Sequence, residues 1–248
     1  MNVLVVMFFC MISSIVVIFV IFAIIDHVRY KEHKYYKLNG KKFYQVISNR
    51  VNYGEWQIYC LLKKNYPNSF FLSNLYLENE QHDDSTVIDL VMVHESGIYV
   101  IESKNYIGGI IGNGYKKIWK KVIRNHPQYH MLNPVWQNRK HIQFLCNALD
   151  HKFYPDEIYS YIIFGKRSTL KKIKYNCIHT RVIKLNQLLS CIGYDVLHSE
   201  YKLDYEEMYQ IYKTLKKYTK PSRKLVKEHR VRVSKKNQID KNYHYPTE

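Results

Sequence analysis

Two short apolar runs joined by a tight turn are the most informative stretch of the hydrophobic pattern. The first run covers residues 87–93, and the second covers 98–101 and continues through Glu102, Ser103 and Lys104. The residues between the runs end in Gly97, which readily adopts a positive φ, so the pattern predicts a β-hairpin. Both faces of both runs are largely apolar, which is typical of central strands covered on two sides.

Three charged residues interrupt this hairpin: Asp89, Glu102 and Lys104. A turn that closes symmetrically places Val93 opposite Ile98. Counting back along both strands then puts Asp89 opposite Glu102, and the alternation of side chains puts Lys104 on the face of Glu102. Two adjacent carboxylates repel each other and lose hydration in an apolar sheet, and a divalent cation such as Mg²⁺ removes both penalties.

These three charges therefore predict a metal site for hydrolysis. Bound Mg²⁺ keeps water ligands that can be activated for attack. Lys104 would orient or deprotonate the attacking water, or offset charge on a phosphate. The alternative interpretation is an ordinary salt bridge among exposed residues at a strand end.

The rest of the pattern predicts helices and strands on either side of the hairpin. Asn52 is the expected N-cap of the first soluble helix. A glycine-punctuated β excursion is expected between residues 105 and 123. Helices are predicted at 52–64, 133–149, 185–192 and 205–218, and further strands at 70–77, 158–164 and 177–185.

The helix at 133–149 has two distinct faces. Pro134 occupies the favoured first position, and Trp136 belongs to the expected core side together with Ile142 and Leu145. Another face carries three polar residues at i, i+3 and i+4 spacing. Considered by itself, this helix is expected to turn that face toward solvent. Those residues are Gln137, Lys140 and His141.

Residues 3–25 are almost unbroken apolar sequence, long enough to cross a bilayer as a helix. A cleaved signal peptide is the alternative, but a basic n-region, a shorter apolar core and a small-residue cleavage site are not evident, so a retained anchor is favoured. Seven lysines and arginines follow within residues 26–50, and none precede the apolar run. The positive-inside rule then places the soluble part in the cytoplasm.

The chain is strongly basic, with a formal net charge of +17, which favours nucleic-acid phosphates or anionic lipid as partners. Residues 213–248 contain twelve lysines and arginines against three acidic residues, a composition that predicts disorder over the tail. The five cysteines are odd in number and lack a Cys-x-x-Cys spacing, so buried free thiols in a reducing compartment are expected.

An ordered set of motifs lies between residues 50 and 165. It comprises Gly54-Glu55, Ile88-Asp89, Gly97-Ile-Tyr-Val-Ile-Glu102-Ser-Lys104-Asn105, Gly108, Gly112, Trp119, Asn133-Pro134, Gln137-Asn138 and His141. This set resembles the nuclease-related domain family, abbreviated NERD and found mainly in bacteria. A single N-terminal membrane helix is also familiar beside such a domain.

The resemblance implies an α/β, restriction-endonuclease-like αβββαβ core of the PD-(D/E)XK group, with a central mixed sheet flanked by helices. That group cleaves phosphodiester bonds with Mg²⁺ or Mn²⁺. Glu102-Ser-Lys104 fits the Glu-x-Lys element of the group. Asp89 follows Ile88, so the literal Pro-Asp pair is absent.

The resemblance also implies a role for each of five site residues. Asp89 and Glu102 would ligate the metal, with Glu55 assisting from the first helix. Lys104 would position or activate water. Gln137 would line the site from the later helix.

The expected organisation has five segments: a transmembrane helix at 1–26, a basic juxtamembrane linker at 27–50, the nuclease-like core at 51–165, a C-terminal strand and helices packing on it at 166–219, and a basic disordered tail at 220–248. The leading hypothesis is a membrane-anchored, Mg²⁺-dependent nuclease acting on DNA. The alternatives are a non-cleaving nucleic-acid-binding module tethered at the membrane and a membrane interaction or scaffolding protein.

Overall fold

The chain folds as two units, Met1–Asn65 and Tyr66–Glu248. The computed structural model describes residues 3–79 and 84–242. Short 3-10 turns connect several of the larger elements in the second unit. They are η2 (Pro155–Glu157), η3 (Leu185–Gln187) and η4 (Lys217–Thr219).

Over its described residues, 3–65, the first unit consists of helices and short connections between them. Its helix α1 (Val3–Glu32) is long and apolar enough to cross a membrane, and none of its most apolar window is buried against protein. The predicted anchor is therefore a continuous helix with apolar side chains on all sides, as expected of a segment that faces lipid. The other helices are α2 (Tyr35–Asn39), α3 (Phe43–Ile47) and α4 (Arg50–Asn65).

The predicted basic linker at 27–50 is folded within this unit. Tyr30, near the end of α1, packs against the rings of Tyr35 and Phe43, and its hydroxyl donates a hydrogen bond to the carbonyl of Lys41. Tyr35 also packs on Tyr59 of α4. Aromatic burial thus orders a segment that looked polar from its charges.

The N-terminus of α4 corrects a prediction about capping. The side chain of Asn49 accepts hydrogen bonds from the backbone N–H groups of Val51 (2.9 Å) and Asn52 (3.2 Å). Asn49 therefore satisfies the first orphan donors of the helix, and the prediction of Asn52 as the cap was wrong. Asn52 instead accepts from Nζ of Lys41 at 2.7 Å.

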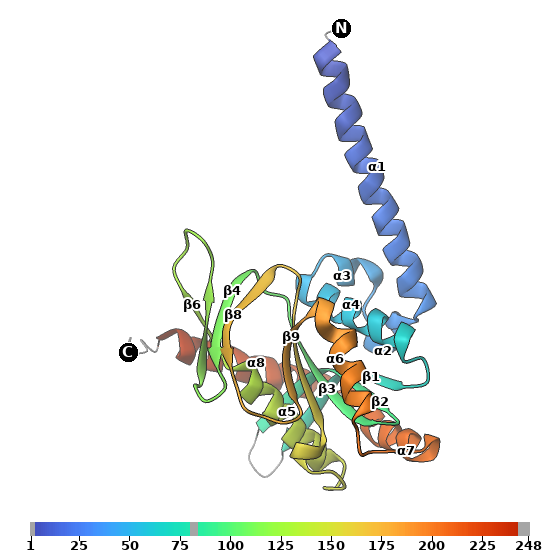
Figure 1. Ribbon diagram of the computed structural model, residues 1–248, viewed down its shortest axis with the longest axis vertical. Coiled ribbons are helices and arrows are strands. Elements are labelled where there is room, and N and C mark those ends of the chain that lie inside the picture. Colours follow the sequence, from blue (N-terminus) through green and yellow to red (C-terminus); the bar gives the residue numbers. More distant parts are fainter. Residues whose placement is uncertain (1–2, 80–83, 243–248) are drawn as a thin grey trace. The chain divides into compact units, whose positions relative to one another are not determined.

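The second unit contains a five-stranded sheet in the order β1-β2-β3-β7-β9 (Figure 1). The first three strands are antiparallel, and β3, β7 and β9 are parallel. The predicted hairpin register is confirmed, because Val93 pairs with Ile98 and Gly97 has φ 123° in the turn. The strands are β1 (Phe70–Asn79), β2 (Asp84–His94), β3 (Gly97–Lys104), β7 (Tyr159–Phe164) and β9 (Thr180–Lys184).

Helices cover this sheet and close its main core. Helix α5 (Pro134–Ala148) packs on β1, β2, β3 and β7, while α7 (Tyr205–Lys216) packs on β1 and β2, and α6 (Leu188–Leu197) packs beside β9. The sheet contributes β-branched and leucine side chains, and the helices contribute their apolar stripes. Members of this core include Leu75, Ile88, Val91, Val100, Ile142, Leu145, Ile211 and Leu215.

A second, four-stranded sheet has the order β6-β5-β4-β8. The predicted β excursion supplies β4 (Gly108–Asn113) and β5 (Ile118–Val122), whereas β6 (Tyr129–Leu132) and β8 (Ser168–Lys174) were not predicted. Trp119 is buried against this sheet. A Cβ at Gly112 would lie 2.0 Å from Cδ2 of Trp119, so only glycine permits the indole to lie on the strand.

The C-terminal region differs from the predicted disordered tail. Helix α8 (Arg223–Asn242) follows α7, which therefore is not the final helix; residues 243–248 lie outside the described part. His229 and Arg232 of α8 each contact the hydroxyl of Ser85 at 3.0 Å.

The order α4-β1-β2-β3-α5-β7 is the predicted αβββαβ arrangement, with β4, β5 and β6 inserted before α5. The predicted fold class, α/β with a mixed sheet flanked by helices, is confirmed. All five cysteines are free, as predicted, but only Cys146 is fully buried, so the expectation of buried thiols was wrong for the others.

Candidate active site

Glu102 is a buried acid in the centre of the five-stranded sheet. It lies in β3, where its Cα pairs with that of Ile162 in β7, and it is only 3% exposed. The β2–β3 ladder runs to the pair Leu90–Ile101, so Asp89 and Glu102 are the next residues on the two strands. Asp89 directs Oδ2 to the backbone N–H of Ser103 at 2.9 Å.

Lys104 lies on the face of Glu102, as predicted. Its Nζ donates to Oε1 of Glu102 at 2.5 Å and to Oε1 of Gln137 at 2.8 Å. The side chains of Lys104 and Glu102 are 12% and 4% exposed. The alternative of a salt bridge among exposed residues therefore does not hold, since this pair is shielded from water.

Helix α5 turns a polar face toward Glu102. Gln137 donates from Nε2 to Oε1 of Glu102 at 2.8 Å, and Nε2 of His141 lies 3.1 Å from Oε2. His141 is 3% exposed, so the expectation of a solvated face was wrong for it. Lys140, on the outer part of the same face, forms a 2.5 Å ion pair with Asp84.

Thr86 of β2 completes this network from the other side. Its Oγ1 lies 2.6 Å from Nδ1 of His141, and both side chains are buried. An ionised carboxylate only accepts hydrogen bonds, so the hydrogen-bond pattern assigns a proton to Nε2 of His141. Thr86 and His141 were not among the predicted site residues; the i, i+4 spacing of Gln137 and His141 was the signal available in the sequence.

Electrostatics keep the buried pair ionised. Burial alone would raise the pKa of Glu102, but the Lys104 ammonium and the hydrogen bond from His141 outweigh it and lower that pKa. Burial alone would lower the pKa of Lys104, but the charge of Glu102, with smaller contributions from Tyr106 and Asp89, raises it. Both groups are thus charged at neutral pH.

The start of α5 is positioned by the turn between β4 and β5. Asn133 caps the helix by accepting from the N–H of Val135 at 2.9 Å, and its Nδ2 donates to the carbonyl of Lys116 at 2.8 Å. Trp136 donates from Nε1 to the carbonyl of Gly114 at 2.7 Å. Trp136 is 46% exposed, so its predicted place in the core was wrong; Val135 is the buried neighbour.

Glu55 is the one predicted site residue that lies in the first unit. It occupies the first half of α4 and is buried. The structure thus brings Glu102, Lys104 and Gln137 into direct contact, with Asp89 beside them on the next strand. The role of Glu55 as an assisting metal ligand stays a prediction.

The donor chemistry of the site fits a hard divalent cation. Asp89 and Glu102 offer carboxylate oxygens, and Mg²⁺ commonly binds one or two carboxylates together with waters and substrate phosphates. Within residues 3–79 and 84–242, no group of three or more His, Cys, Asp or Glu side chains is placed to hold a metal by itself.

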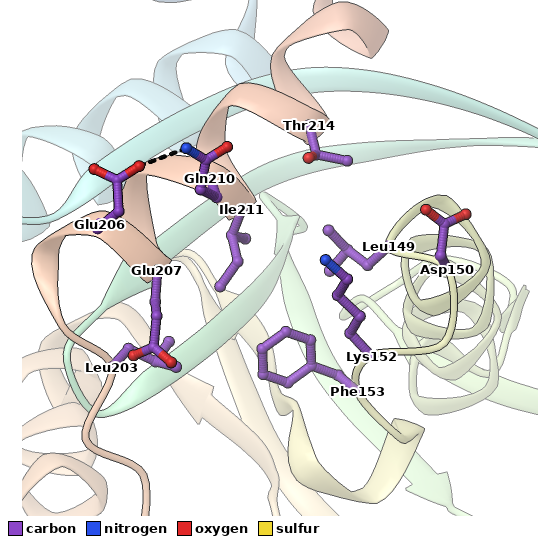
Figure 2. Close-up of a pocket in the computed structure, with 10 residues that line it drawn as sticks. All are labelled: Leu149, Asp150, Lys152, Phe153, Leu203, Glu206, Glu207, Gln210, Ile211 and Thr214. Atoms are coloured by element: carbon purple, nitrogen blue, oxygen red, sulfur yellow. Dashed lines mark hydrogen bonds between the residues drawn. The ribbon is translucent and has the colours of Figure 1, made fainter.

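A cavity of about 470 Å³ opens beside this network. Gln137 and His141 line it together with Thr86, Trp136 and Lys117. Another cavity, of about 440 Å³, lies between the end of α5 and α7, and Figure 2 shows Phe153 and Ile211 on two of its sides. None of its lining residues belongs to the carboxylate network, so it is set apart from the candidate active site.

The αβββαβ order and the buried Glu-x-Lys element at a central strand define a nuclease-like α/β domain. Residues 50–165 match the family described as the nuclease-related domain, which confirms the resemblance. The chain is also similar to an uncharacterized protein of Bacillus anthracis, with 25% identity over 177 residues, covering 71% of this chain and 80% of that protein. No solved structure matches it.

Proposed function

We propose that this protein is a membrane-anchored, metal-dependent nuclease that hydrolyses phosphodiester bonds in DNA. The observation that carries the proposal is the buried contact between Glu102 and Lys104, held by Gln137 and His141 of α5. Burying two opposite charges without a functional need is a weak source of stability, because the desolvation cost offsets the attraction. A buried, hydrogen-bonded pair at a cavity therefore supports a catalytic role.

Asp89 and Glu102 would hold Mg²⁺ or Mn²⁺. When bound, such an ion lowers the pKa of its water and neutralises charge on the phosphate. The remaining residues would orient the Glu102 carboxylate and balance its charge. Gln137 and His141 fix both oxygens of Glu102, and Thr86 fixes the ring of His141.

The raised pKa of Lys104 distinguishes between its predicted roles. A lysine whose ammonium is stabilised by Glu102 and Asp89 stays protonated at neutral pH. It is then poorly suited to deprotonate water, but well suited to orient the attacking water and to offset the negative charge that develops on the phosphate. We infer the electrostatic role.

Membrane attachment and substrate recruitment follow from the charge distribution. Helix α1 would anchor the chain, and the basic residues after it would keep the soluble part in the cytoplasm. The net charge of +17 would attract DNA over a distance of about a Debye length, roughly 10 Å at 0.1 M salt. Cys177 is exposed, so an impermeant maleimide should label it only after the cell membrane is permeabilised.

The decisive experiment is DNA cleavage by the full chain in detergent, with Mg²⁺, with Mn²⁺ and with a chelator. Cleavage should require the ion and should be abolished by Asp89→Asn and by Lys104→Met. Glu95→Gln is a matched control, because Glu95 is an exposed acid in the turn of the same hairpin. Activity that survives both site substitutions would show that another site or a contaminant is responsible.

One observation favours a second candidate, a tethered module that binds nucleic acid without cleaving it. Both oxygens of Glu102 already accept hydrogen bonds from protein groups, so the negative charge of this buried acid is compensated without a metal ion. This candidate predicts DNA binding that weakens steeply with salt and is unaffected by a chelator. Binding of that kind, with no cleavage under either ion, would select it over the nuclease.

A further inference from the structure

The cavity beside Glu102 is lined by residues of β2, the β4–β5 turn, β6, α5 and α8. The start of β2 supplies Ser85 and Thr86, α5 supplies Trp136 and Gln137, the β4–β5 turn supplies Lys117, and α8 supplies Arg232. Gln137 touches Glu102 directly, so the cavity and the candidate active site share a wall. A group bound in the cavity would therefore lie next to the carboxylates.

The lining of this cavity carries a net positive charge. Lys117, Lys140 and Arg232 line it, and among its described lining residues Asp84 is the one acid, which forms an ion pair with Lys140. The pKa of His229, also in the lining, is lowered by burial and then by the charges of Arg232 and Lys140. The field in the cavity thus disfavours another cation and favours an anion.

Trp136 gives the cavity an aromatic surface. The other two tryptophans, Trp56 and Trp119, are 2% and 1% exposed, whereas Trp136 is 46% exposed. Its indole N–H is already bonded to the carbonyl of Gly114, which fixes the ring. An orientated, exposed indole beside cationic side chains is the combination that binds nucleotides in single strands, by stacking and by phosphate contact.

We propose that this cavity holds one unpaired nucleotide of the substrate strand, next to the phosphate that is cleaved. The base would stack on Trp136, and its flanking phosphates would contact Lys117, Lys140 and Arg232. The volume of about 470 Å³ suits a small ligand and not a duplex. The inference rests on the proposed function and adds a substrate class: single-stranded, frayed or locally unpaired nucleic acid.

Binding without cleavage tests the cavity separately. The full chain in detergent, with chelator present, is titrated with a twelve-nucleotide oligothymidylate and with a twelve-base-pair duplex. The single strand should quench tryptophan fluorescence, because Trp136 is the exposed indole. Anisotropy of a labelled single strand should show Trp136→Leu weakening binding at least about tenfold, and Trp136→Phe should retain most of the affinity.

Matched variants of the same turn provide controls. Lys116 and Lys117 are adjacent and exposed, but only Lys117 lines the cavity. Lys117→Gln should weaken binding and flatten its salt dependence by about one unit of slope, whereas Lys116→Gln should change neither. Tyr115→Leu removes an exposed aromatic residue outside the cavity and should leave affinity unchanged.

The outcomes separate this inference from the proposed function. Equal affinity for single strand and duplex, or affinity unaffected by Trp136→Leu, would overturn the inference, even if metal-dependent cleavage is confirmed. Absence of any binding would overturn it as well. Quenching that depends on Trp136, in a protein that cleaves nothing, would support the cavity and reject the nuclease.

Discussion

Nε2 of His141 lies 3.1 Å from Oε2 of Glu102, across the interface between α5 and the central sheet. On its other side the imidazole contacts Thr86 at 2.6 Å, so one ring connects β2 to β3 through a helix. The orientation of the Glu102 carboxylate therefore depends on Thr86, a residue that acts on it through the ring of His141.

Thr86→Val removes the hydroxyl while nearly conserving volume. A buried ring nitrogen then loses its partner, which costs about 1–3 kcal/mol of unfolding free energy. Cleavage should also slow, because His141 is free to rotate away from Glu102. Thr86→Ser should restore the rate, and the comparison is made by cleavage kinetics and chemical denaturation of the full chain in detergent. A normal rate in the valine variant would show that Thr86 does not position His141.

Lys104→Met should destabilise the second unit by about 3–5 kcal/mol, because Glu102 remains buried without its counter-charge. Glu102→Gln in the same chain removes the other charge, so the double variant should be far more stable than the sum of the single effects predicts. Denaturant titration of the four proteins measures this coupling. Effects that add within about 0.5 kcal/mol would contradict a direct interaction.

The lowered pKa of Glu102 predicts how stability depends on pH. A carboxyl with a lower pKa in the folded state stabilises the fold above its unfolded value, about 4.3, and loses that contribution as pH falls through the folded value. The stability difference between wild type and Glu102→Gln should be constant from pH 7 to about 5.5 and shrink below about 4. A difference that is independent of pH down to 2 would argue against an ionised Glu102.

Gly112→Ala should destabilise the second unit by about 1–3 kcal/mol through overpacking, because its Cβ would lie 2.0 Å from Cδ2 of the Trp119 indole. Gly193→Ala is the control, since a Cβ there would meet only the Tyr66 hydroxyl at 3.9 Å. In helix α6 that change should be neutral or stabilising. Thermal unfolding distinguishes the two, and equal effects would show that the close approach to Trp119 is relieved without cost.

The local sequence pattern predicted the central hairpin because the apolar runs and the turn residues indicate the same structure. Apolar runs flank a turn at Gly97, and the register follows from counting. Strand β8 escaped prediction because its lysines leave only Leu170 and Ile173 as apolar positions, so its existence depends on pairing with β4. Charge alone predicted disorder for α8, yet His229 and Arg232 contact Ser85, far away in sequence.

In the candidate site, too, some features were predictable from the local sequence and others depend on contacts between distant residues. Glu102 and Lys104 stand out because charges rarely interrupt an apolar strand. The burial of His141 was not predictable from helical spacing, which groups it with Lys140 but does not say which flank of the polar face turns inward. The rotation of α5 about its own axis is determined by the contacts of Asn133 and Trp136 with the β4–β5 turn. Trp136 was misassigned for the same reason.

The β4–β5 turn holds the start of α5 by hydrogen bonds from outside the main sheet. Asn113, Gly114 and Lys116 offer the carbonyls that hold the first turn of the helix. The residue that follows them, Lys117, lines the cavity. Inserting or deleting a residue in this turn would move Lys117, the proposed phosphate contact, and would also rotate the polar face of α5. A change in turn length would therefore alter substrate affinity and the orientation of the site residues at the same time.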